Sequence, residues 1–117
     1  MLAANYDITL DRAADYSFVL TIQNQAGSPV NLGSPTATFF ADVREVRTKK
    51  EVLDLTPDVL GTATNGQVLI SLTKAQTRTL KAGEGIYEWD LFMNRDSKRE
   101  RLLYGSLTAR AQITNDA

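Results

Sequence analysis

The fold class of this chain is decided by residues 85–93, which read GIYEWDLFM. Large apolar side chains stand at every second position from Tyr87 to Met93, and Glu88 and Asp90 stand between them. This alternation is typical of a half-buried β-strand, which turns one face to the core and the other to solvent. We therefore expect Trp89 to be a core anchor. Glu88 and Asp90 are expected to be solvated carboxylates rather than a catalytic pair of the glycosidase kind.

The same period of two recurs along the chain. It predicts seven strands, at residues 6–11, 16–23, 37–46, 51–55, 67–72, 85–93 and 101–113. One segment departs from this pattern, because Thr73 and Gln76 have the spacing of a capping box, which predicts one or two helical turns. Seven strands without a long helix predict an all-β fold, a single antiparallel immunoglobulin-like β-sandwich over residues 1–117.

Two aromatic residues near the start of the sixth strand support the immunoglobulin-like mapping. Tyr87 stands where a tyrosine corner would bond back to upstream backbone, although an ordinary strand tyrosine explains the same position. Trp89 follows two residues later, where an immunoglobulin domain carries its second cysteine. Because this chain has no cysteine, the indole is expected to fill that central volume.

Composition excludes several classes of function. Thirteen basic and fourteen acidic residues give a net charge of −1, which argues against a dedicated nucleic-acid binder or a binder of anionic membranes. The chain has neither histidine nor cysteine, and no nucleophile or phosphate-binding motif, so we predict no enzyme activity, no metal site and no cofactor. Asp7, Asp11 and Asp15 match no calcium-loop spacing and are read as surface charge.

The ends of the chain and its apolar runs predict a protein made in a cytosol. Residues 1–7 have neither the basic region nor the apolar region of a signal peptide, and no apolar run is long enough to span a membrane.

Two basic clusters mark the tips of predicted hairpins. One contains Arg44, Arg47, Lys49 and Lys50, and the other contains Arg95, Lys98, Arg99 and Arg101. Acidic residues are interleaved with both clusters, so the local charge surplus is modest. Solubility and edge protection explain such tips, and contact with an acidic partner protein is the functional alternative.

Strand parity predicts an interface on the sheet formed by the third, sixth and seventh strands. If Phe39, Trp89 and Leu107 point inward, the residues that alternate with them along the strands point outward. These outward residues form an apolar set with a rim of mixed charge. The apolar set is Phe40, Ile86, Phe92, Leu102 and Tyr104, and the rim includes Arg44, Glu88, Asp90 and Arg110. Cover by a loop or by the N-terminal segment is one alternative. A sugar-stacking platform made of Phe40, Phe92 and Tyr104 is another.

Several motifs, in chain order, resemble those of immunoglobulin-like domains in tailed-bacteriophage structural proteins, such as the N-terminal module of baseplate upper proteins. They are SFVLTI (17–22), GSPVNL (27–32), ATFFADVR (37–44), GQVLISL (66–72), TKAQT (73–77), GIYEWDL (85–91) and RLLYGSL (101–107). The resemblance implies a non-enzymatic virion structural protein of the tail, baseplate or neck. It would bind neighbouring virion proteins and form a homo-oligomer within a symmetric assembly. A capsid decoration protein and a carbohydrate-binding module are the alternatives.

Overall fold

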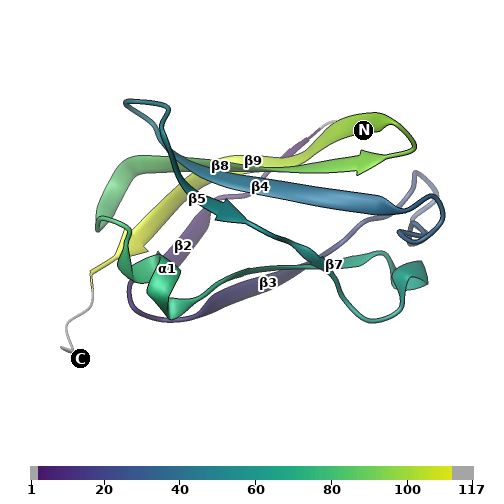
Figure 1. The fold of residues 1–117 in the computed structure, drawn as a ribbon, viewed down its shortest axis with the longest axis horizontal. Helices are drawn as coiled ribbons and strands as arrows, with labels where there is room; N and C mark the ends of the chain where they lie inside the picture. The colour runs from purple at the N-terminus through teal and green to yellow at the C-terminus, as the bar shows by residue number, and fades with distance from the viewer. Residues whose placement is uncertain (1–2, 112–117) are drawn as a thin grey trace.

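The structure, a computed structural model, describes residues 3–111, which fold into two β-sheets packed face to face (Figure 1). The elements in chain order are β1 (Ala4–Asn5), β2 (Ile8–Asp11), β3 (Tyr16–Thr21), β4 (Ala37–Glu45), β5 (Glu51–Leu55), β6 (Asp58–Val59), the 3-10 helix η1 (Ala63–Asn65), β7 (Gln67–Leu72), α1 (Lys74–Arg78), β8 (Gly83–Arg95) and β9 (Lys98–Arg110).

The larger sheet has the order β1-β9-β8-β4-β5, with β2 also paired to β9, and the smaller sheet has the order β3-β7-β6. Figure 1 shows β4, β5, β8 and β9 as the upper layer and β3 and β7 as the lower one. The prediction of an all-β, immunoglobulin-like sandwich is confirmed. Strands β5 and β7 coincide with the predicted ranges 51–55 and 67–72.

The first predicted strand, residues 6–11, was expected to be continuous and antiparallel to its neighbour, and both expectations are wrong. Only residues 8–11 of this range form a strand, β2, because Tyr6 and Asp7 lie in a break that follows β1 (Ala4–Asn5). Both β1 and β2 run parallel to β9. At the break, the carbonyl of Tyr6 turns inward and accepts a hydrogen bond from Trp89 Nε1 at 2.8 Å. A Cβ at Gly105 would clash with this carbonyl oxygen, so only glycine permits the close approach.

Trp89 is the predicted core anchor, and the structure confirms its burial at 3% exposure. Its ring makes edge contacts with Tyr6 and with Phe18 of β3, at centroid distances of 6.3 and 6.0 Å. Because Trp89 belongs to the larger sheet and Phe18 to the smaller, the indole joins the two layers. The inward parity of Phe39 and Leu107 is confirmed as well, since both are buried.

The connection between β7 and β8 also follows the sequence prediction. Thr73 and Gln76 form the capping box, with Thr73 Oγ1 accepting from the Gln76 amide at 3.2 Å. The Tyr87 hydroxyl accepts a hydrogen bond from the Lys81 amide at 2.8 Å, which is the predicted tyrosine corner. Arg12, which the sequence did not single out, donates to the carbonyls of Leu80 and Arg78.

No helix within residues 3–111 is both long and apolar enough to cross a membrane.

The β8–β9 hairpin is longer and tighter than predicted. The predicted strands 85–93 and 101–113 leave residues 94–100 as the polar tip between them. The ladder instead continues to the pair Arg95–Lys98, and only Asp96 and Ser97 turn the chain. Both turn residues have positive φ angles, 54° and 62°, which suit a two-residue hairpin turn. At its other end β9 stops at Arg110, Ala111 is exposed outside the strand, and predicted strand residues 112 and 113 lie outside the described residues.

A β-bulge in β9 changes the predicted parity of one residue. Leu91 pairs with Leu103 but Phe92 pairs with Arg101, so Leu102 is the extra residue between them. The bulge turns Leu102 into the core, where it is 5% exposed, beside the buried Leu103. The prediction that Leu102 is an exposed interface residue is therefore wrong. Arg101 occupies the outward position instead.

Candidate protein-docking face

The outward-facing residues of β5, β4, β8 and β9 form a surface, here called the outer face, on which side chains line up in rows across the strands. Cross-strand pairing defines these rows, because directly opposed residues project from the same side of a sheet. The rows are Phe40–Phe92–Arg101, then Asp54–Asp42–Asp90–Tyr104, then Glu51–Arg44–Glu88–Ser106.

The first part of the outer face is an alternation of aromatic rings and guanidinium groups. The Arg99 guanidinium carbon lies 4.5 Å from the ring centroid of Phe92 and 5.8 Å from that of Phe40. Arg101 lies 5.6 Å from Phe92 and 5.7 Å from the ring of Tyr104. These are cation–π distances, so the two arginines are held against the face rather than extended into solvent. Phe40 and Tyr104 remain 47% and 39% exposed.

The second and third rows carry ion pairs. Arg44 lies 3.2 Å from Asp42, Arg101 lies 3.4 Å from Asp90, and Lys49 lies 2.9 Å from Glu88. Desolvation raises the pKa of Asp90 above its ordinary value, and the nearby Asp42 adds to this, while Arg101 and Arg44 act in the opposite direction. Asp90 is thus less freely solvated than the sequence predicted.

A groove of about 580 Å³ runs across the outer face between the rows. Its walls come from β4, β8, β9 and the break between β1 and β2. Among the residues that line it are Asp42, Arg44, Glu88, Asp90, Arg101 and Tyr104. Acidic, basic and aromatic side chains therefore line the groove together.

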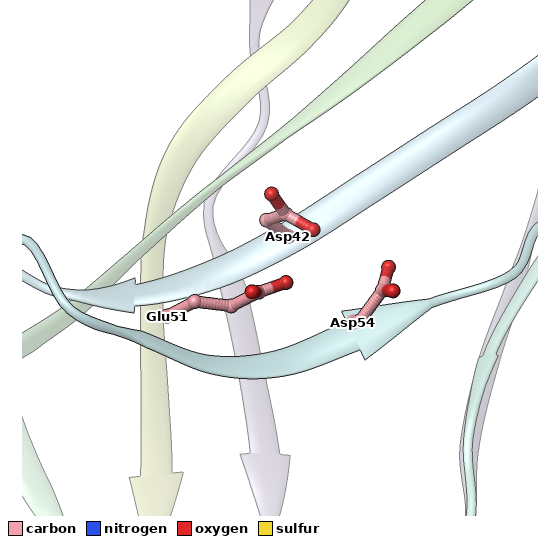
Figure 2. Close-up of side chains that lie close together, drawn as sticks. All are labelled: Asp42, Glu51 and Asp54. Atoms are coloured by element: carbon pink, nitrogen blue, oxygen red, sulfur yellow. The ribbon is translucent and has the colours of Figure 1, made fainter.

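Three carboxylates gather at the β5 edge of the outer face, as Figure 2 shows. One oxygen atom from each of Asp42, Glu51 and Asp54 lies within 4.8 Å of the others. A hydrogen bond with Asp42 and the negative charge of Asp42 raise the pKa of Glu51. Exposed acidic groups commonly gather in this way without an ion. The sequence did not bring these residues together, because they meet only through the pairing of β4 with β5.

The structure separates the predicted interface residues into two groups. Phe40, Phe92, Tyr104 and Arg44 lie together on the outer face. The others do not join them: Leu102 is buried, Ile86 is half-buried and packs against the core, and Arg110 pairs with Asp11 at 2.8 Å. Arg110 is about 20 Å along β9 from Tyr104, because a strand rises about 3.3 Å per residue.

The alternative function, a sugar-stacking platform made of Phe40, Phe92 and Tyr104, is not favoured by this geometry. Stacking on a sugar ring needs an open aromatic face, but Arg99 lies over both Phe92 and Phe40, and Arg101 lies over Phe92 and Tyr104. From the sequence, both arginines were expected at a hairpin tip, where they would serve solubility and edge protection or would contact an acidic partner protein. Their role on the face depends on the extra ladder length of β8 and β9 and on the bulge at Leu102.

Comparison with known proteins gives little. No protein-family model matches the chain, and no curated protein matches it. Among solved structures, a chain named Tim-1 matches with a TM-score of 0.46 and 8% sequence identity, covering 98% of this chain and 100% of that one. At this score the likeness carries no argument about what the chain does.

Proposed function

We propose that this chain is a non-enzymatic structural module of a tailed-bacteriophage virion, which assembles by docking neighbouring virion proteins on its outer face. The motif resemblance supports the virion setting and a place in the tail, baseplate or neck, with capsid decoration as the alternative. The observation that supports docking is the strip of Phe40, Phe92 and Tyr104 with Arg99 and Arg101 stacked over it.

Residue chemistry favours protein contact at this strip. Aromatic side chains and arginine are the residue types that most often carry binding energy at the centre of protein interfaces. The two arginines are already held against the rings, so a partner would immobilise them at a lower entropic cost than free side chains. The whole strip stands on paired strands rather than on a loop, which keeps its geometry the same before and after docking.

The charge pattern defines the chemistry of the partner surface. Carboxylate groups or carbonyl oxygens on the partner would meet Arg99 and Arg101, and apolar side chains would cover Phe40 and Tyr104. At the β5 edge of the outer face, lysine or arginine side chains would meet the carboxylates of Asp42, Glu51 and Asp54. Such complementarity sets the register of docking and rejects partners with like charge.

Incorporation of charge variants into particles tests the proposal. Phe92→Glu places a carboxylate in the aromatic strip and is expected to reduce the amount of this chain in purified particles at least tenfold. The melting temperature of the isolated domain should stay within a few degrees, because the ring is outside the core. Leu60→Glu is the matched control, since Leu60 is a 37% exposed apolar residue on the β6–η1 connection, and it should be incorporated normally.

Two results would overturn the proposal. Normal incorporation of both Phe92→Glu and Tyr104→Glu would show that the outer face is not the docking surface. Failure of the wild-type chain to copurify with particles, in a host that carries the surrounding genes, would remove the virion assignment itself.

A further inference from the structure

Strand β3 is an open edge of the smaller sheet. Among the described residues β3 pairs only with β7, while β6 lies on the far side of β7. Its six residues are therefore hydrogen-bonded along one side alone. An edge strand of this kind presents a row of free N–H and C=O groups, which is a template for another strand.

The free backbone groups belong to Ser17, Val19 and Thr21. The Ile22 amide donates to the Gly66 carbonyl at 2.7 Å, which directs the backbone of Ile22 toward β7. Because N–H and C=O directions alternate along an antiparallel strand, the even-numbered residues of β3 face β7 and the odd-numbered residues face the open edge. The side chains of the same three residues are exposed on the outside of the sheet.

Strand β5, at one edge of the larger sheet, is protected and β3 is not. Strand β5 carries Glu51 and Asp54, and a register shift against β4 interrupts its ladder. Charges and bulges are the usual means by which an edge is kept from pairing with another chain. Strand β3 reads YSFVLT, without a charge, a proline or a recorded bulge.

Apolar surface accompanies this open edge. Phe18 and Leu20 point toward the core but are only half-buried, and so is Tyr16. Tyr6 stacks on Phe18 with ring centroids 4.7 Å apart and is itself 38% exposed. A strand added beside β3 would bring its own inward side chains against these rings and remove them from water.

We propose that two copies of this chain pair through β3, antiparallel, with Val19 on the two-fold axis. In this register Val19 faces Val19 of the other copy, and Ser17 faces Thr21, so each free backbone group meets its complement. On the inner side Phe18 faces Leu20. The closed, self-complementary pairing is the type that two-fold dimers use.

Charge favours a second copy as the occupant. Strand β3 has no charged residue to oppose itself across the axis, and the flanking Asp15 falls opposite the neutral Gln23. Val19 is also 47% exposed, which makes it one of the most exposed large apolar residues among those described. The pairing uses the smaller sheet, whereas the outer face belongs to the larger sheet. It therefore does not depend on the proposed function, and it leaves the outer face free.

Solution mass tests the pairing first. Sedimentation of the wild-type chain should give twice the monomer mass, and Val19→Lys should reduce it to the monomer mass at the same concentration, because two lysines would meet on the axis. Val19→Thr keeps a β-branched, uncharged side chain and should stay dimeric. Leu60→Lys adds the same charge on an exposed residue elsewhere and should stay dimeric too.

Crosslinking tests the register. The chain has no cysteine, so Val19→Cys introduces a single thiol, which a short bifunctional maleimide should join to its counterpart across the axis. Ser17→Cys should not crosslink, because the two Ser17 positions would be about 14 Å apart along the paired strands.

Three results would overturn this proposal. The first is a wild-type chain that stays monomeric at the highest concentration reached. The second is a Val19→Lys chain that stays dimeric; if Phe92→Glu then dissociates it, self-association runs through the outer face instead. The third is equal crosslinking of the Ser17→Cys and Val19→Cys chains, which would show a different arrangement.

Discussion

The two faces of β8 are built from neighbouring residues of one strand but are held by different forces. On the inner face Tyr87, Trp89 and Leu91 are buried, and the polar atoms of the first two have backbone partners. On the outer face Asp90 and Phe92 are half-exposed and are held by side chains of β9. The inner residues are therefore coupled to the fold of the whole chain. The outer residues are organised among themselves, so they can be changed without unfolding the protein.

Trp89→Ala should give the largest effect and would test this contrast most directly. Removing a large, buried aromatic side chain typically costs about 3–5 kcal/mol, because contacts are lost and a cavity remains. The change also leaves the Tyr6 carbonyl without its donor. Denaturant unfolding measures the loss, with Phe40→Ala on the outer face as the control. A Trp89→Ala chain as stable as the control would contradict the coupling of the inner face to the fold.

Tyr87→Phe isolates one hydroxyl group on the inner face. The ring stays, but the Lys81 amide loses its acceptor in a part-buried site, and an unsatisfied donor of this kind costs about 1–3 kcal/mol. Tyr104→Phe removes the same hydroxyl group from an exposed ring on the outer face and should change stability by less than about 0.5 kcal/mol. Thermal melts of the two variants measure the difference. Equal losses would show that the corner bond adds nothing to stability.

Asp90→Asn should give the smallest effect, and it depends on pH. Burial raises the pKa of Asp90, so the folded chain holds this proton more tightly than the unfolded chain does. Ionisation then lowers stability as the pH rises from the ordinary value of 3.8 through the raised one. The variant should match wild type at pH values below that range and exceed it above, by less than about 1 kcal/mol.

Denaturant midpoints for Asp90→Asn and wild type, measured across the acidic range and at neutral pH, give this difference. A variant less stable than wild type at neutral pH would mean that the Arg101–Asp90 pair outweighs the cost of burial. In that case the second row of the outer face would be a stabilising element rather than a surface that is free to bind.

The local sequence pattern was sufficient to predict burial wherever a strand keeps one face toward the core along its whole length. The alternation around Trp89 predicted its burial, and the same period predicted Phe39 and Leu107 as inward residues, because period two is a property of the strand itself. The capping box of Thr73 and Gln76 was readable for a similar reason, since both partners lie within one helical turn.

Pattern failed where a distant strand sets the geometry. Leu102 is apolar at an alternating position, and nothing in its own segment marks the bulge that pairs Arg101 with Phe92. Ile86 was misplaced for a related reason, since the ladder of β8 with β9 is irregular between Gly83 and Tyr87. Neither irregularity can be seen without the partner strand.

The sequence by itself determined the all-β class, the position of most strands and the inward set around Trp89, because each depends on residues close together in the chain. Only the tertiary structure decided which residues share the outer face. Arg99 and Arg101 cover Phe92 because a two-residue turn and a bulge bring β9 into that register. Likewise, β3 has an open edge because the N-terminal strands pair with β9 and not with β3. This pairing joins segments about 100 residues apart in the chain.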